Sequence, residues 1–110
     1  MKIALRFVEG TLAGQVKEAF LYDRKHVLVG RDTQANIVLP EQDRSASTNH
    51  AKIVFEKGEI YINDVGSHYG TFVNHKPATR SKIKQGDFIR FGVKGPLAEF
   101  LVVPDGQTLA

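Results

Sequence analysis

One stretch of the sequence gathers an unusual number of hydrogen-bond donors. Residues 40–55 read PEQDRSASTNHAKIVF, and the first part of this stretch contains Arg44, Ser45, Ser47, Thr48 and Asn49. The second part is apolar and is typical of a core strand. Clustered guanidinium and hydroxyl groups suit an acceptor with many lone pairs, and a phosphate dianion is such an acceptor.

Two further connections carry similar groups. Arg31 follows Gly30 at the end of an apolar run, and residues 64–71, DVGSHYGT, contain Ser67 and His68. In a β-sandwich the loops at one end cluster on a rigid frame. If the three connections share an end, cationic and hydroxyl donors converge there with few competing carboxylates. This arrangement predicts a phosphate-binding site.

The elements that must position these residues are expected to be strands. Turn signals recur about every eight to twelve residues, which favours a sandwich or barrel. Apolar runs predict strands at 2–8, 15–22, 26–29, 37–39, 50–56, 59–64, 71–73, 76–77, 88–92 and 99–103. Residues 15–22 also fit a helix, but the segment is short and lacks a cap signature. We therefore predict an all-β, antiparallel sandwich of about ten strands with no substantial helix.

Two tight turns fix part of this pairing. Lys57-Gly58 and Asn74-His75 each separate two expected strands by two residues. A two-residue hairpin turn needs positive φ, which Gly58 can supply. Lys57-Gly58 therefore predicts a β-hairpin, and Asn74-His75 predicts another tight connection.

Composition narrows the class of protein. The chain has 110 residues, 42% of them hydrophobic, and contains no cysteine. This size predicts one domain, placed at residues 1–104, with 105–110 as a tail or the start of a linker. The lack of cysteine excludes disulfides and thiolate metal sites, and fits a cytoplasmic location. No apolar run predicts a membrane span or a signal peptide.

Four motifs in order resemble the forkhead-associated (FHA) domain. They are Gly30-Arg31, Ser47-x-x-His50-Ala51, Asp64-x-x-Ser67-x-x-Gly70-Thr71-x-x-Asn74, and Ile83-x-x-Gly86-Asp87-x-Ile89-x-x-Gly92. The resemblance runs from Val29 to Gly92. It implies an eleven-stranded β-sandwich that binds phosphothreonine peptides. It also implies an adaptor in Ser/Thr kinase signalling, carried by a larger multidomain protein.

The resemblance also implies residue roles. Arg31 and Ser47 would hold the phosphate, and Thr48 would add a contact. Arg44, His68 and Tyr69 are candidates for peptide contact. The remaining matched positions would support the loops, namely Gly30, His50, Gly70 and Asn74.

One position departs from the family pattern. Members commonly carry asparagine before the glycine of the third motif, where it contacts the peptide backbone, but this chain has Tyr69. A phenol cannot reproduce the paired donor and acceptor of an amide. The departure motivates an alternative, in which an FHA-like module binds a non-phosphorylated protein partner.

Two other classes of function fit the sequence less well. The segment from Lys76 to Lys84 is basic, but the net charge of +3 is mild and stacking aromatics are lacking, so nucleic-acid binding is disfavoured. Ser47 and His50 suggest a dyad without a recognisable orienting acid. We therefore predict no enzyme activity, no catalytic residue, no metal site and no cofactor.

Overall fold

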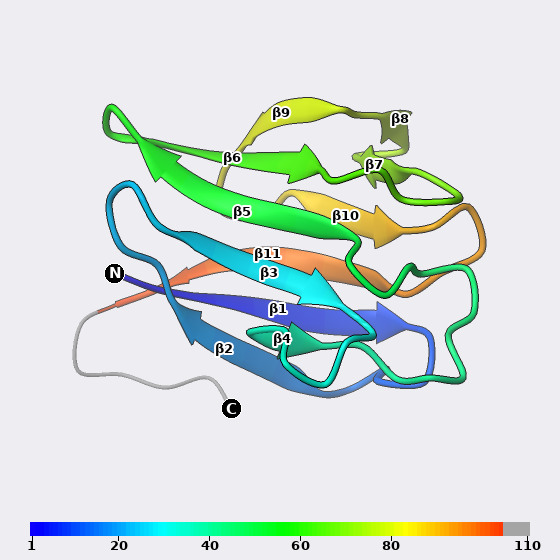
Figure 1. The fold of residues 1–110 in the computed structure, drawn as a ribbon. Helices are drawn as coiled ribbons and strands as arrows, with labels where there is room; N and C mark the ends of the chain where they lie inside the picture. Colours follow the sequence, from blue (N-terminus) through cyan, green and yellow to red (C-terminus); the bar gives the residue numbers. More distant parts are fainter. Residues whose placement is uncertain (105–110) are drawn as a thin grey trace.

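The computed structural model describes residues 1–104, which form eleven strands in two sheets and no helix. The six-stranded sheet has the order β2-β1-β11-β10-β7-β8 (Figure 1). Its strands are β1 (Lys2–Glu9), β2 (Val16–Phe20), β7 (Thr71–Val73), β8 (Lys76–Pro77), β10 (Phe88–Phe91) and β11 (Leu97–Val103).

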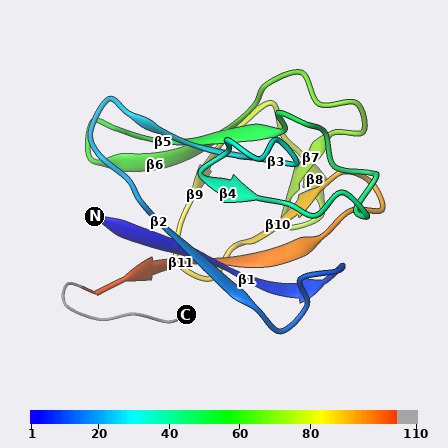
Figure 2. The ribbon, with the colours of Figure 1, turned by 60° about the horizontal axis from the view of Figure 1, so that its bottom comes forward.

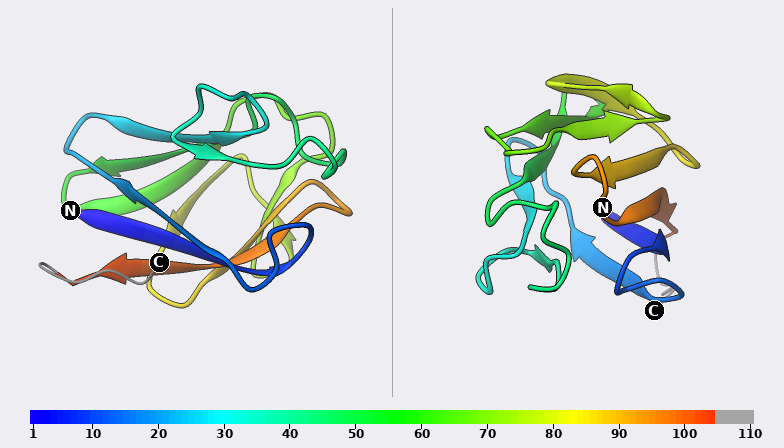
Figure 3. Two further views of the ribbon diagram at one scale, coloured as in Figure 1. Left: turned by 90° about the horizontal axis from the view of Figure 1, so that it is seen from below. Right: turned by 90° about the vertical axis from the view of Figure 1, so that its right-hand side faces the viewer.

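The second sheet has five strands in the order β4-β3-β5-β6-β9 and faces the first, as the turned views show (Figures 2 and 3). Its strands are β3 (His26–Gly30), β4 (Ile37–Val38), β5 (Ala51–Glu56), β6 (Glu59–Asp64) and β9 (Arg80–Ile83). The β3–β4 pair is parallel, whereas every other strand pair in the described chain is antiparallel.

The core lies between the two sheets. Alternate residues of each strand point inward, as the period of a pleated strand requires. The buried side chains include Ile3, Leu5, Phe7, Ile53, Ile62, Ile89, Phe91 and Phe100. Burying each of these stabilises the fold by about 1.5–3 kcal/mol relative to exposure.

The predicted all-β sandwich is confirmed, and the ambiguous segment at 15–22 is a strand, β2. Both hairpin turns are confirmed, with φ of 51° at Lys57 and 77° at Gly58, and of 50° at Asn74 and 70° at His75. The Arg80–Ile83 strand was not expected, because Ile83 is its only apolar residue. The domain boundary at 104 stays a prediction, since residues 105–110 lie outside the described part of the chain.

Strand direction brings the three donor-rich connections together. β3 and β6 are both antiparallel to β5, so β3 and β6 end at the same end of the sheet where β5 begins. The β3–β4, β4–β5 and β6–β7 connections therefore lie at one end of the sandwich, on the right in Figure 1. Because strands make up all the regular structure of residues 1–104, this part of the chain has no helix that could cross a membrane.

Candidate anion-binding site

Arg31 is held in place by the β4–β5 loop. Its backbone N–H donates to the Ser47 carbonyl oxygen at 3.1 Å, and its Nε donates to the Ala46 carbonyl oxygen at 2.7 Å. The side chain is 17% exposed, and its Nη1 lies 3.5 Å from Oε1 of Glu41. These contacts fix the guanidinium plane and leave terminal N–H groups for a ligand.

Ser47 faces the β6–β7 loop. Its Oγ accepts a hydrogen bond from the backbone N–H of His68 at 2.9 Å. A hydroxyl group has one donor proton besides its lone pairs. Because the oxygen already accepts from the main chain, the proton remains available to donate to a ligand oxygen.

His50 is a buried link between the two loops. Its Nδ1 accepts from the Ser47 N–H at 2.9 Å, and its Nε2 lies 2.8 Å from the Gly70 carbonyl oxygen, to which it donates in this tautomer. The ring is fully buried and meets the edge of Phe91. Burial lowers the pKa of His50, although the Gly70 bond and the charge of Asp64 oppose this shift.

This geometry is not that of a catalytic dyad. His50 contacts the backbone nitrogen of Ser47, whereas the Ser47 hydroxyl contacts His68. A general base must reach the hydroxyl proton that it abstracts. His50 therefore has a structural position, as the sequence resemblance implied.

Asp64 organises the β6–β7 loop. Its carboxylate accepts hydrogen bonds from the N–H groups of Gly66 and Ser67, from the Ser67 hydroxyl, and from Thr71 Oγ1 at 2.8 Å. Burial opposes ionisation of Asp64, but these hydrogen bonds outweigh it and lower the pKa of the carboxyl. Asp64 thereby fixes the conformation of the loop that carries His68.

The three loops surround one open concavity of about 580 Å³. Its lining residues are Arg31, Arg44, Ala46, Ser47, Thr48, Asn49, Val65, Gly66, His68 and Tyr69. The lining thus contains two arginines, several neutral donors and, within residues 1–104, no carboxylate. Such a surface is suited to binding an anion.

Arg44 is anchored through its two neighbours. Asp43 Oδ1 accepts from Thr11 Oγ1 at 3.0 Å, and Ser45 Oγ accepts from the Lys94 N–H at 3.0 Å. These bonds tie the β4–β5 loop to the β1–β2 and β10–β11 loops of the other sheet. They hold the Arg44 backbone while its side chain is exposed at the concavity.

On the opposite wall, His68 and Tyr69 form an aromatic pair. Their rings meet edge to face with centroids 4.7 Å apart. Tyr69 is 50% exposed. The wall therefore presents two aromatic rings to the concavity.

The supporting residues divide into two groups. A side chain at Gly30 would collide with the Thr48 carbonyl oxygen, and Gly70 has a φ of 85°, so both glycines belong to the site's frame. Asn74 lies elsewhere. Its amide bonds Asp87 at 3.1 Å and the Phe88 N–H at 3.0 Å, which joins the β7–β8 and β9–β10 turns.

The sequence did not single out Glu41 or the Ala46 carbonyl as neighbours of Arg31. Backbone acceptors leave no trace in a sequence, and Glu41 looks like any exposed loop carboxylate. The spacing from Asp64 to Ser67 was a readable signal, because Asp commonly bonds backbone N–H groups two or three residues ahead.

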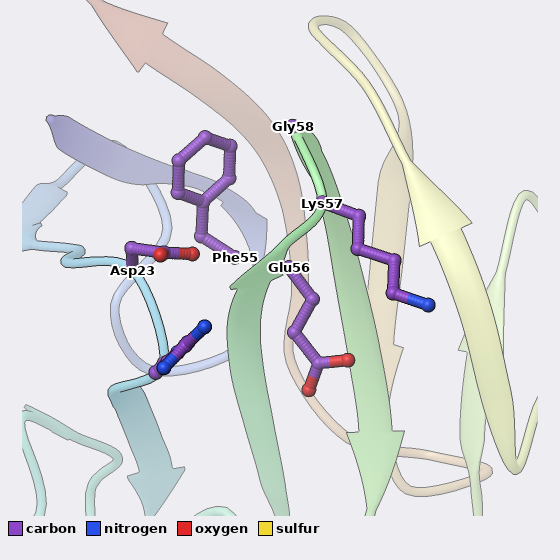
Figure 4. Close-up of a pocket in the computed structure, with 6 residues that line it drawn as sticks. Asp23, Phe55, Glu56, Lys57 and Gly58 are labelled. Carbon is purple, nitrogen blue, oxygen red and sulfur yellow. The ribbon is translucent and has the colours of Figure 1, made fainter.

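A larger hollow of about 680 Å³ lies at the β2–β3 and β5–β6 turns and is lined by Asp23, Arg24, Phe55, Glu56, Lys57 and Gly58 (Figure 4). It mixes carboxylates with cations, and Lys57 points to the side of the β5–β6 hairpin away from Asp23 (Figure 4). The hollow therefore lacks the single sign of charge that an anion site needs.

The basic segment around β9 is largely neutralised. Three of its four cations form ion pairs within the domain, namely Arg80 with Glu56, Lys82 with Glu59 and Lys84 with Asp87. Arg80 also covers the ring of Tyr61, with 4.0 Å between guanidinium carbon and centroid. These contacts disfavour a nucleic-acid surface there.

Known proteins are similar to this chain in sequence or in fold. The oxoglutarate dehydrogenase inhibitor of Corynebacterium efficiens is 36% identical over 73 residues, covering 66% of this chain and 50% of that protein. The glycogen accumulation regulator GarA of Mycolicibacterium smegmatis is also 36% identical over 73 residues, covering 66% of this chain and 45% of that protein. The chain spans about half the length of the curated relatives it matches.

The N-terminal FHA domain of Rad53p from S. cerevisiae, solved with a phosphothreonine peptide, superposes with a TM-score of 0.78. The alignment covers 93% of this chain and 94% of that chain at 19% identity, which shows a common fold. The family model of the FHA domain matches residues 27–92, more than half of the sequence. The chain therefore belongs to the FHA domain family.

Proposed function

We propose that this protein binds phosphothreonine-containing proteins or peptides through the concavity between the β3–β4, β4–β5 and β6–β7 connections. The observation that carries the proposal is that a preorganised Arg31 guanidinium and a Ser47 hydroxyl with a free proton line the same concavity. Family membership and the absence of carboxylates among the described lining residues also support it.

The mechanism of binding is electrostatic capture followed by hydrogen bonding. The Arg31 guanidinium attracts the dianion and donates charge-assisted hydrogen bonds, which are about twice as strong as neutral ones. Ser47 donates its hydroxyl proton, and Thr48, exposed at the same surface, adds a further donor. His50 takes no part in contact because it is buried beneath the loops.

The biological role follows from this chemistry. We place the domain as an adaptor in Ser/Thr kinase signalling, acting in the cytoplasm where ATP-dependent kinases work, and as part of a larger protein. Two relatives are named as an inhibitor and a regulator, which supports a binding role and not an enzymatic one.

The decisive experiment is calorimetric titration of the Arg31→Ala variant with a phosphothreonine peptide chosen from a phosphopeptide array. Loss of charged hydrogen bonds should weaken binding by about 10- to 100-fold. Arg6→Ala is the matched control, because Arg6 pairs with Glu99 on a strand outside the site. Unchanged affinity in Arg31→Ala would refute the proposal.

A second candidate function is binding of a non-phosphorylated partner. The aromatic wall of His68 and Tyr69 favours it, since rings pack against side chains without needing a phosphate. The same titration with the dephosphorylated peptide decides between the two. Equal affinity for both peptides supports the second candidate, and a strict requirement for phosphate excludes it.

A further inference from the structure

Asn49 is the one asparagine of residues 1–104 whose side-chain amide forms no hydrogen bond within the domain. The chain has four asparagines. Three of their amides are occupied, that of Asn36 by the Leu28 N–H, that of Asn63 by Arg80, and that of Asn74 by Asp87 and Phe88. The Asn49 amide forms no hydrogen bond within residues 1–104, and its side chain is exposed in the wall of the concavity.

The backbone on both sides of Asn49 is rigidly held. The Thr48 carbonyl oxygen accepts from the Asp32 N–H at 3.0 Å, and the His50 N–H donates to the Val29 carbonyl oxygen at 3.0 Å. The His50 carbonyl oxygen also accepts from the Val65 N–H at 3.1 Å. The backbone that carries the amide is therefore fixed, so a ligand that uses the amide has to order only the Asn49 side chain.

An amide is suited to one ligand chemistry in particular. Its Oδ1 accepts and its Nδ2 donates, so one side chain can pair with both the N–H and the C=O of an extended peptide. Among the described lining residues, Asn49 is the only one with a side-chain amide. The facing wall offers the Tyr69 phenol and the His68 ring, neither of which is an amide.

We propose that Asn49 binds the main chain of the phosphopeptide beside its phosphorylated residue, through paired hydrogen bonds from Nδ2 and to Oδ1. This inference rests on the proposed function, since it assumes that the ligand enters the concavity with its phosphate at Arg31. It assigns peptide recognition to the β4–β5 loop, which also carries Ser47. The aromatic wall then contacts the side chains of the peptide.

The test compares two probes, inorganic phosphate and the phosphothreonine peptide, with the wild-type domain and the Asn49→Ala variant. Losing two hydrogen bonds should weaken peptide binding by about 5- to 50-fold. The affinity for inorganic phosphate, followed by NMR titration, should stay within about twofold because Arg31 and Ser47 are untouched. Gln34→Ala is the control, since it removes an exposed amide outside the concavity.

Peptides with single backbone esters locate the contact. An ester removes one peptide N–H, and the ester that removes the partner of Asn49 should weaken wild-type binding but add no further loss in Asn49→Ala. Additive losses at every position would overturn the inference, as would equal weakening of both probes in Asn49→Ala. If Arg31→Ala weakens both probes while Asn49→Ala changes neither, only the Asn49 inference fails. No loss in Arg31→Ala overturns the proposed function itself.

Discussion

At the scale of single residues, the site is defined by which groups are already occupied. Arg31 uses Nε for the Ala46 carbonyl oxygen and directs Nη1 toward Glu41. Ser47 accepts from the backbone and keeps its proton. Each proposed phosphate-binding side chain therefore has donor groups left, and Glu41 is, within residues 1–104, the one carboxylate paired with Arg31 that would compete with an incoming anion.

Removing the Glu41 charge should strengthen phosphopeptide binding. Glu41 is 73% exposed and lies 3.5 Å from Arg31, so its contribution is that of a weak surface pair. We expect Glu41→Gln to lower the Kd by about 1.5- to 5-fold at low salt, because Glu41 no longer competes with the phosphate for Arg31 or repels the phosphate. Calorimetry at two salt concentrations measures this, and the gain should shrink as salt screens the charges.

The control for Glu41 is Glu56→Gln. Glu56 also pairs with an arginine, Arg80, at 3.3 Å, but it lies at the far end of β5 from the site. It changes the net charge equally, so a similar gain in this variant would show that only long-range charge matters.

At the scale of elements, close contact between β3 and the β4–β5 loop positions Arg31 and Ser47, the proposed phosphate-binding residues. Gly30 ends β3 against the Thr48 carbonyl, with the Arg31 and Asp32 N–H groups bonded to the same loop. β4 then pairs in parallel with β3, with the Leu39 N–H donating to the Gly30 carbonyl oxygen at 2.7 Å. Backbone hydrogen bonds and close contact therefore hold the β4–β5 loop against the end of β3.

Two glycine substitutions distinguish the energetic cost of disturbing this close contact from the cost of a positive φ alone. Gly58→Ala meets no atom within 4 Å and suffers only its φ of 77°, so it should cost about 1–2 kcal/mol of unfolding free energy. Gly30→Ala drives Cβ into a backbone carbonyl and should cost about 3 kcal/mol, with weaker phosphopeptide binding. Urea unfolding and calorimetry measure both effects. A Gly30→Ala variant as stable as Gly58→Ala would contradict this account.

At the scale of the whole molecule, the burial of His50 couples stability to pH. A lowered His pKa means that the unfolded chain binds the proton more readily than the native fold does. Stability should therefore be full above pH 6.5, the ordinary His value, and fall as the pH drops below it. The lowered carboxyl pKa values of Asp64 and Asp87 remove further stability only near and below pH 4.

Thermal unfolding between pH 7.5 and 5.5 tests the His50 coupling. The other three histidines are exposed, so a variant with His26, His68 and His75 all changed to Gln should keep the same pH slope. Loss of the slope in that variant would show that His50 is not its source.

Local chemistry alone determined much of this protein. Lys57-Gly58 and Asn74-His75 encode their hairpins because Gly and Asn adopt positive φ more readily than other residues do. The alternation of Ile3, Leu5 and Phe7 encodes one buried strand face because successive side chains of a pleated strand point to opposite faces. The order of the four motifs identified the family and the candidate phosphate ligands.

Only the tertiary structure decided which groups remain available. The strand Arg80–Ile83 exists because β6 pairs with it, and β4 is parallel because its loop returns beside β3. The pairing of Arg31 with Glu41 depends on the return of β4 beside β3, and the surroundings of the Asn49 amide depend on the β6–β7 loop, which is distant in sequence. Hydrogen-bond partners across such distances are set by the packing of the two sheets, and no spacing along the chain encodes them.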